Sequence, residues 1–277
     1  MNKSSPFQDE ILTRNAPAPL PKSPLFIGSL GKAMKILDAF GGNKTRLTAT
    51  EIARISGLGA SAAQRFIFTL TALGLLAKDE RTRQYRLSVR LLDFTYLFLR
   101  SYPVSTIGFS HLEQLSHITG EYMSLSVLDR ADVVYIVRTP GVERREHPGL
   151  VGGRLPSFSA SNGRVLLAAL PPAEAREIVE SADRRPLTAK SLTKTAAIMA
   201  KIDEARSNGY SIVDEETELG VLSLAVAVYD RSRRPLCAIS TPLAKRKWSM
   251  GEAVKKLVPE MNRTAQALGR ALAGAEV

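Results

Sequence analysis

The chain of 277 residues has very few of the side chains that build disulfides and metal centres. Cys237 is its only cysteine, which excludes a disulfide within one chain and a cysteine-based zinc site. The three histidines are His111, His117 and His147, and the six-residue step between the first two does not put them on one helix face as in a zinc-binding helix. We therefore expect no metal and no cofactor.

A long hydrophobic run is also missing from the sequence. No apolar stretch approaches the roughly 20 residues needed to span a bilayer. The start of the chain, MNKSSPFQDE, lacks the basic and then apolar pattern of a signal peptide. We expect a cytoplasmic protein without a membrane partner.

Acidic residues are scarcer than basic ones, 27 against 38, so the formal net charge is +11. Residues 1–100 carry 15 Lys and Arg against 7 Asp and Glu (15 − 7 = +8), whereas residues 101–277 carry 23 against 20 (23 − 20 = +3). This asymmetry favours a polyanionic partner for the first part of the chain. Charge alone does not separate DNA from RNA or from an anionic membrane surface.

The length predicts two domains. Residues 1–25 contain five prolines and few large apolar side chains, which is typical of a flexible arm. Leu30, Met34 and Leu37 recur at helical spacing and predict a helix over residues 29–40. Gly41 and the glycine after it end that helix.

Residues 47–76, LTATEIARISGLGASAAQRFIFTLTALGLL, carry the most specific pattern. Thr48 and Glu51 form a capping box that starts a short helix, and Gly57 ends it. A second helix is expected from Ala60 or Ser61 to Leu73. Its predicted buried face consists of Ala63, Phe66, Ile67, Leu70 and Leu73, and its predicted outward stripe consists of Ser61, Gln64, Arg65 and Phe68. Two short helices joined at a glycine predict a helix-turn-helix.

The polar turn DERTRQ, residues 79–84, lies between strand-like Leu76 and Tyr85 and predicts a β-hairpin wing. Gln64 and Arg65 suit base edges in the major groove, since glutamine can pair with adenine and arginine with guanine. Ser61 and Thr69 suit phosphate contacts, and the two wing arginines suit the DNA backbone or the minor groove. The candidate DNA-binding residues are therefore Ser61, Gln64, Arg65, Thr69, Arg81 and Arg83. The alternative for each is a solvated surface role.

The pattern divides the chain into four segments: the arm at 1–25, a winged helix-turn-helix DNA-binding domain at 26–87, a linker helix at 88–103 and a second domain at 104–277. In the last, we expect helices at 105–119, 161–170, 172–181, 190–207 and 249–273, and strands at 121–128, 132–138, 210–214, 221–229 and 235–241. This order predicts a mixed α+β domain around an antiparallel sheet.

From Ile27 to Leu272 the sequence resembles the IclR family of bacterial regulators. The matching strings are LTATEIARISGL, LTALGLL, YRLS, VGGRLP, GRVLLAALP, GYSIVDEETELGV and AISTP. DEETELGVLSLAVAV and ASNGRVLLAALP are most similar to the regulators of protocatechuate, hydroxybenzoate and β-ketoadipate breakdown. The resemblance implies a GAF-like α/β effector-binding domain and homodimers or homotetramers on palindromic double-stranded DNA operators. Family members often carry basic residues where this chain has Ala60 and Phe68.

The resemblance also implies a site for a small organic acid, aromatic or dicarboxylic. Ser161 and Asn162 stand at a helix start, which favours an anion. Ala238 replaces a pocket serine of the family and favours a ligand with more apolar surface. The candidate effector-binding residues are Arg138, Ser161, Asn162, Asp214, Ser223 and Ser240. Core, capping or surface roles are the alternative.

Two other functions remain open. GLGASA at 57–62 fits a relaxed dinucleotide fingerprint, but it follows a capped helix and not a strand, and no nucleophile elbow or P-loop is present. We therefore expect no enzyme. A thiol redox sensor would depend on Cys237, whose apolar neighbours are typical of a buried, inert strand residue.

Overall fold

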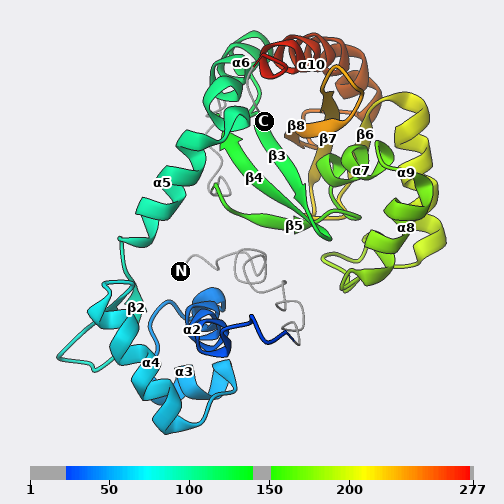
Figure 1. Ribbon diagram of the computed structural model, residues 1–277. Helices are drawn as coiled ribbons and strands as arrows, with labels where there is room; N and C mark the ends of the chain where they lie inside the picture. Colours follow the sequence, from blue (N-terminus) through cyan, green and yellow to red (C-terminus); the bar gives the residue numbers. More distant parts are fainter. Residues whose placement is uncertain (1–22, 140–150, 275–277) are drawn as a thin grey trace. The chain divides into compact units, whose positions relative to one another are not determined.

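The computed structural model describes residues 23–139 and 151–274 (Figure 1). The chain forms two compact units, one ending at Phe98 and the other beginning at Leu99, and each is treated by itself. Nearly all of the predicted flexible arm at 1–25 and most of the loop TPGVERREHPG, with His147, lie outside the described residues.

The first unit is a small helical domain with a two-stranded sheet (Figure 1). Its elements are α2 (Gly28–Asp38), the short helix η1 (Ala39–Gly41), α3 (Ala49–Ser56), α4 (Ala60–Ala72), β1 (Leu76–Lys78) and β2 (Tyr85–Leu87). All three α-helices place one apolar side into a common core, whose largest members are Ile36, Phe40, Leu47, Ile52, Ile67, Leu70 and Leu76. The helix α5 (Leu91–Ser101) follows and includes the boundary between the two units.

Local signals start and end the helix-turn-helix as predicted. The Thr48 hydroxyl accepts from the Glu51 backbone N–H, and the Glu51 carboxylate accepts from the Thr48 N–H at 2.8 Å. Gly57 has φ +67, the left-handed conformation that ends α3. One expectation is wrong: Leu73 follows the last residue of α4 and is 51% exposed, so it is outside the core.

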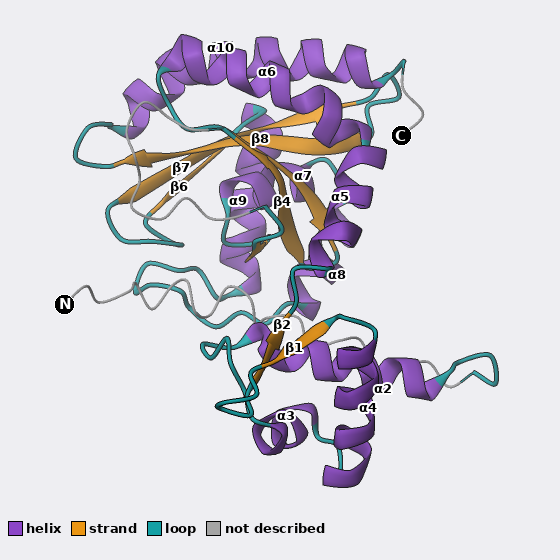
Figure 2. Ribbon diagram, turned by 90° about the vertical axis from the view of Figure 1, so that its left-hand side faces the viewer, coloured by secondary structure: helices purple, strands orange, loops and turns teal. Residues whose placement is uncertain are grey.

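The second unit is a six-stranded antiparallel sheet with helices on both faces (Figure 2). Its strands run in the order β5-β4-β3-β8-β7-β6. Their bounds are β3 Ser124–Asp129, β4 Asp132–Arg138, β5 Arg154–Pro156, β6 Ser211–Asp214, β7 Val221–Tyr229 and β8 Pro235–Ala244. The helices are α6 Pro103–Thr119, α7 Ser161–Ala168, α8 Pro172–Ser181, α9 Thr195–Asn208 and α10 Met250–Leu272. The predicted mixed fold around an antiparallel sheet is confirmed.

The two faces of this sheet have different compositions. The face under α6 and α10 is covered by large apolar side chains such as Leu125, Val226 and Ile239. The face under α7 carries small residues where the helix crosses it, among them Ala225 and Ala238. Because strand side chains alternate between faces, this difference follows from the period-two pattern along β3, β7 and β8.

The largest differences from the sequence expectation in this unit concern one helix and two strands, while α6 begins two residues earlier and β8 ends three residues later than expected. The helix expected at 190 begins at Thr195, because the Thr188 and Ser191 hydroxyls donate to the carbonyls of Glu215 and Glu216 and hold a loop there. The strand β5 was not predicted, and β3 begins at Ser124 and not at 121. No helix among the described residues is long and apolar enough to span a membrane.

Candidate DNA interface and ligand site

The outward face of α4 consists of the side chains that the sequence assigned to DNA. Ser61, Gln64 and Arg65 are all exposed, while Ala63 and Ile67 on the opposite side are buried in the core. No described residue forms a hydrogen bond or ion pair with the side chains of Gln64 or Arg65. An amide and a guanidinium on one helix face can therefore reach base edges without breaking an internal contact.

The start of α4 adds a second feature that suits phosphate. The helix begins after Gly59, and no side chain caps its first N–H groups. The positive end of a helix with free N–H donors favours an anion.

Thr69 lies one turn after Arg65 and donates its hydroxyl back to the Arg65 carbonyl at 2.9 Å. While this bond is formed, the Thr69 oxygen can accept a hydrogen bond but cannot donate one to a phosphate.

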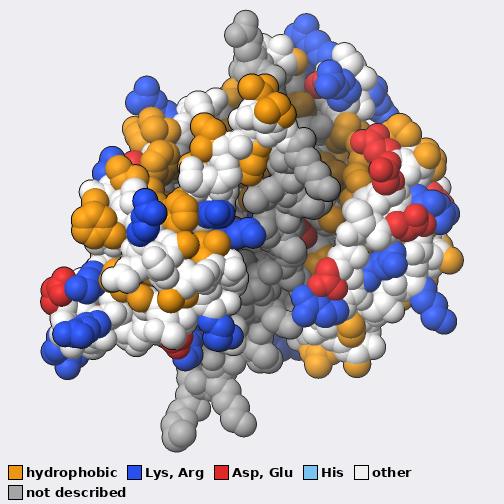
Figure 3. Space-filling model, turned by 60° about the horizontal axis from the view of Figure 1, so that its bottom comes forward, with side chains coloured by type: hydrophobic (Ala, Val, Ile, Leu, Met, Phe, Trp, Pro, Cys, Tyr) orange, Lys and Arg blue, Asp and Glu red, His pale blue; other side chains and the backbone are white. Residues whose placement is uncertain are grey.

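The wing is a β-hairpin whose turn is organised by one carboxylate. Asp79 accepts from the backbone N–H groups of Arg81 and Thr82 at 2.9 and 3.1 Å, and the first cause of its lowered pKa is the bond from Thr82. Arg83 takes a left-handed backbone, φ +55, and both wing arginines are exposed. Figure 3 shows Lys and Arg side chains (blue) scattered over the face in view. Two backbone hydrogen bonds between Leu47 and Tyr85, 3.0 and 2.8 Å long, join the wing to the segment just before α3.

In the second unit, polar side chains gather on the sheet face at the start of α7. The Ser161 and Ser223 hydroxyl oxygens lie 2.6 Å apart, and the Ser124 and Ser240 oxygens lie 2.9 Å apart. The Asn162 amide donates to the Ser126 hydroxyl at 2.8 Å. The structure therefore brings four of the six predicted effector residues together where the start of α7 meets the sheet: Ser161 and Asn162 on the helix, and Ser223 and Ser240 on the strands.

Two interactions fix the start of α7 against this face. A Cβ at Gly163 would lie 2.1 Å from the Ser157 carbonyl oxygen, so only glycine permits this approach. Next to it, the buried Arg164 donates to both oxygens of Glu216 at 2.7 Å and to the Phe158 carbonyl at 2.8 Å. Ala160 precedes the helix and provides no side-chain cap. Asn162 Oδ1 accepts from the Gly163 N–H at 3.0 Å, so among the first N–H groups of α7 those of Ser161 and Asn162 are the ones without a capping side chain.

Arg138 belongs to the same face, since it pairs with Ser124 across β3 and β4. Its guanidinium carbon lies 3.6 Å from the centre of the Tyr135 ring, and Nη1 donates to the Tyr122 hydroxyl at 3.4 Å. Nε is buried and has no hydrogen-bond partner among the described residues. Burial raises the pKa of Tyr135, so its phenol stays protonated. A buried, unpartnered guanidinium N–H is a favourable partner for a carboxylate.

Asp214 lies elsewhere. In β6, Val213 pairs with Ser223, so Asp214 points to the other face of the sheet. Its carboxylate accepts from Lys245 Nζ at 2.6 and 2.9 Å. The structure therefore does not bring Asp214 together with the other five predicted effector residues.

Sequence reasoning missed several residues of this face, chiefly Ser124, Ser126, Tyr135 and the Arg164–Glu216 pair. The alternation of serine with apolar residues in SLSV would have indicated the polar face of β3. No comparable signal indicates that Arg164 and Glu216 meet, because they are far apart in sequence. The structure describes no group of three or more His, Cys, Asp or Glu side chains that could hold a metal ion.

A winged helix-turn-helix followed by an α/β unit with a small polar site defines the class of ligand-responsive transcription regulators. The chain matches the profile "IclR helix-turn-helix domain" over residues 29–80 and "Bacterial transcriptional regulator IclR C-terminal" over residues 97–270. It therefore belongs to the IclR family of bacterial transcriptional regulators.

Two curated relatives support this membership. The Pca regulon regulatory protein of Pseudomonas putida is 32% identical over 237 residues, which are 85% of this chain and 81% of that protein. The p-hydroxybenzoate hydroxylase transcriptional activator of Acinetobacter baylyi is 28% identical over 88% of this chain and 91% of that protein. The predicted subgroup is confirmed.

Two solved structures share the fold. A transcriptional regulator of Rhodococcus sp. RHA1 is 31% identical and superposes with a TM-score of 0.78, covering 91% of this chain and all of that one. The inducer-binding domain of the PobR transcription factor from Acinetobacter, a double mutant in complex with 3-hydroxybenzoic acid, is 27% identical. It has a TM-score of 0.54 and covers 58% of this chain and 94% of its own.

Proposed function

We propose that this regulator binds a palindromic operator through α4 and the wing, and that a small aromatic or dicarboxylic acid bound beside α7 modulates this binding. The observation that carries the ligand half is the buried Nε of Arg138, which has no partner among the described residues on the polar face under α7. A carboxylate there would accept from Arg138 and lie near the N–H groups at the start of α7. Ser161, Asn162, Ser223 and Ser240 would hold its remaining polar atoms.

The ligand class follows from the mixture of groups around this site. The Tyr135 ring beside Arg138 and Ala238 across from Ser126 supply apolar surface. A benzoate ring could lie on such surface while its carboxylate meets the guanidinium. The relatives named for the Pca regulon and for p-hydroxybenzoate hydroxylase support the same class of acid.

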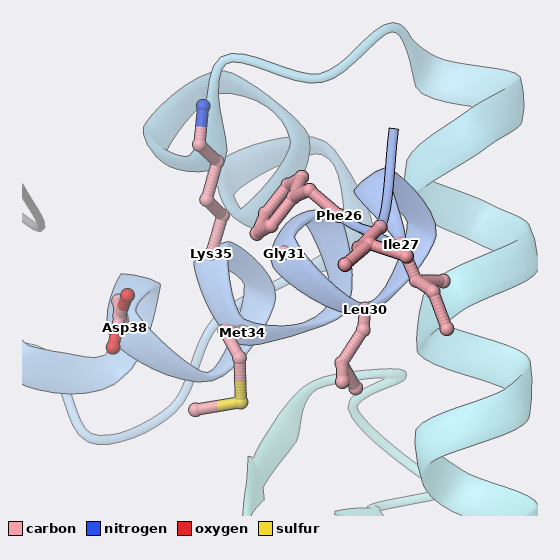
Figure 4. Close-up of a pocket in the computed structure, with 8 residues that line it drawn as sticks. Phe26, Ile27, Leu30, Gly31, Met34, Lys35 and Asp38 are labelled. Atoms are coloured by element: carbon pink, nitrogen blue, oxygen red, sulfur yellow. The ribbon is translucent and has the colours of Figure 1, made fainter. Parts of the chain in front are cut away.

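We also propose that the protein acts as a homodimer or homotetramer. Residues between Leu25 and Asp38, the last residue of α2, line an apolar groove of about 450 Å³, in which Leu30 and Met34 point the same way (Figure 4). Leu25, Ile27 and Leu30 are each more than 60% exposed. A second copy on this face would bury them, and a two-fold dimer matches the symmetry of a palindromic operator.

Light scattering should give the mass of two or four chains. Leu30→Glu should lower it, and Leu219→Glu, at an equally exposed leucine of the second unit, should not.

The other two functions have less support. Cys237 is fully buried in β8 and burial raises the pKa of its thiol, so little reactive thiolate forms. The relatives are named as regulators and not as enzymes. Operator binding by the natural protein that peroxide leaves unchanged, or that peroxide changes equally in Cys237→Ser, would dispose of the redox sensor, and turnover of a candidate acid would revive the enzyme.

The test of the proposed function is a titration of the purified protein into DNA from its own upstream region. It is done with and without protocatechuate, hydroxybenzoate and β-ketoadipate, at two salt concentrations. We expect specific, salt-sensitive binding that one acid alters. Specific binding that none of the three acids alters would contradict the proposed ligand class. Absence of specific binding would contradict the proposed binding to an operator. A footprint with and without the acid tests one further proposal, that α5, which includes the boundary between the two units, relays the signal to the DNA-binding unit.

A further inference from the structure

A large aromatic side chain stands exposed in the middle of the recognition helix. Phe68 is 76% exposed, more than any other large apolar residue of α4. The other large apolar residues within the helix, such as Ile67 and Leu70, lie in the core. Phe68 is therefore not part of the fold's apolar interior, and its exposure requires another explanation.

Helical geometry puts Phe68 on the face that carries the candidate base-reading side chains. With 3.6 residues per turn, positions three and four apart lie on one face, so Phe68 stands one turn after Gln64 and Arg65 and two turns after Ser61. Buried Ala63 and Ile67 mark the opposite side. Whatever surface meets the amide and the guanidinium also meets the phenyl ring.

This surface does not have the character of a protein docking patch. The exposed neighbours of Phe68 on α4 are polar or small, namely Gln64, Arg65, Thr69 and Ala72. Protein interfaces form on contiguous apolar patches, such as the groove on α2 or the exposed Leu92, Phe94, Tyr96 and Leu97 of α5. A single ring among polar side chains, beside the positive charge of Arg65, instead fits a polyanion that offers isolated apolar groups.

The major groove of DNA offers one such group, the C5-methyl of thymine. We propose that Phe68 contacts thymine methyl groups in the operator and so acts as a specificity-determining residue. This inference rests on the proposed DNA-binding function. It gives α4 a preference for thymine that its hydrogen-bonding side chains alone do not supply. This preference adds to the adenine or guanine contacts proposed for Gln64 and Arg65.

The test replaces thymine with uracil, which removes only the methyl group. The upstream fragment is amplified with dUTP in place of dTTP and titrated with the full-length protein and with Phe68→Ala. Binding of the unmodified protein should weaken about fourfold for each contacted methyl, the effect of exposing one buried methylene-sized group. Phe68→Ala should bind thymine DNA more weakly than the unmodified protein and should lose no further affinity on uracil DNA. Single thymine-to-uracil replacements then locate the contacted base pair.

Two controls separate this contact from other effects. Leu73→Ala removes an exposed leucine at the end of the same helix but well around it from Phe68, and it should keep the full uracil penalty. Phe68→Leu should keep part of the uracil penalty. Thermal unfolding should show that all variants fold.

An equal uracil penalty in the unmodified protein and in Phe68→Ala, with operator binding intact, would overturn the thymine contact while leaving the proposed function standing. A change of oligomeric mass in Phe68→Ala would overturn it in favour of a contact between copies. No specific binding to either DNA would overturn both.

Discussion

The guanidinium of Arg164 and the carboxylate of Glu216 meet in two parallel hydrogen bonds of 2.7 Å, with Arg164 only 1% exposed. Arg164 belongs to α7 and Glu216 to the loop after β6, and Glu216 also accepts from the Leu192 backbone N–H at 3.2 Å. This pair therefore joins the start of α7 to two loops at once. Ser161 and Asn162 are the first two residues of the same helix, so we expect the pair to help hold them in position.

Breaking this pair should be strongly destabilising. Glu216→Leu leaves the buried charge of Arg164 uncompensated and should lower the free energy of unfolding by about 3–5 kcal/mol. The double variant Arg164→Met with Glu216→Leu should recover most of that loss. Urea unfolding at neutral pH measures both.

The matched control is the exposed pair Arg176–Glu180 on α8, whose charged atoms lie 3.7 Å apart. Arg176→Ala should cost less than about 1 kcal/mol. A loss of the same size for the buried and the exposed pair would show that the Arg164–Glu216 pair does not stabilise the fold more than a surface ion pair does.

A second prediction concerns the pH dependence of stability at Glu215. Hydrogen bonds from Lys190, Lys245 and the Gly220 N–H hold the pKa of this carboxyl at about 2, below its ordinary value of 4.5. A pKa that folding lowers contributes stability at high pH, and this stability disappears as the pH falls through the folded value. The stability difference between the natural protein and Glu215→Gln should therefore be full above about pH 5 and shrink toward pH 2.

Thermal unfolding from pH 7 to the lowest pH at which the protein stays folded checks this. Glu218→Gln in the same loop is the control, because its side chain is exposed and forms no hydrogen bond or ion pair with the described residues. A stability difference between the natural protein and Glu215→Gln that stays constant over this range would show that the hydrogen bonds to Glu215 do not stabilise its charged form.

A third prediction separates base reading from phosphate binding. Arg65→Ala should lower operator affinity by a factor of roughly 5–150 and relax sequence preference, since a good base contact is worth about 1–3 kcal/mol. Arg83→Ala should weaken binding to all sequences and reduce the slope of log affinity against log salt by about 1. Fluorescence anisotropy with operator and scrambled DNA distinguishes the two. Arg231→Ala, at an exposed arginine of the second unit, should change neither the operator affinity nor its salt dependence.

A fourth prediction concerns the ligand site. Arg138→Gln should weaken binding of the acid that alters operator affinity by a factor of roughly 10–150, because a hydrogen bond to a charged group is worth about 1.5–3 kcal/mol. Ser161→Ala should have a smaller effect, since Ser223 shares its hydrogen bond. Isothermal titration calorimetry measures both.

Asp214→Asn is the informative control, because Lys245 already engages that carboxylate on the other face of the sheet. Ligand affinity should stay within about twofold, a few tenths of a kcal/mol. A loss comparable to that of Arg138→Gln would return Asp214 to the ligand site.

Much of the first unit was predictable because its signals are local. Thr48 and Glu51 are three residues apart and cap one helix, and Gly57 ends it by its own backbone conformation. The outward stripe of α4 follows from helical periodicity alone. Leu73 was misplaced because the helix ends just before it, where periodicity no longer decides which way a side chain points.

In the second unit, the sequence by itself determined most of the strands, the helices and the antiparallel sheet, since each depends on a short repeating pattern. Only the tertiary structure decided which polar residues meet. Ser124 reaches Ser240, Arg164 reaches Glu216 and Asp214 turns away to Lys245 through strand register and loop packing. Shifting a strand by one residue exchanges its two faces, and the register depends on long-range pairing that no local window contains.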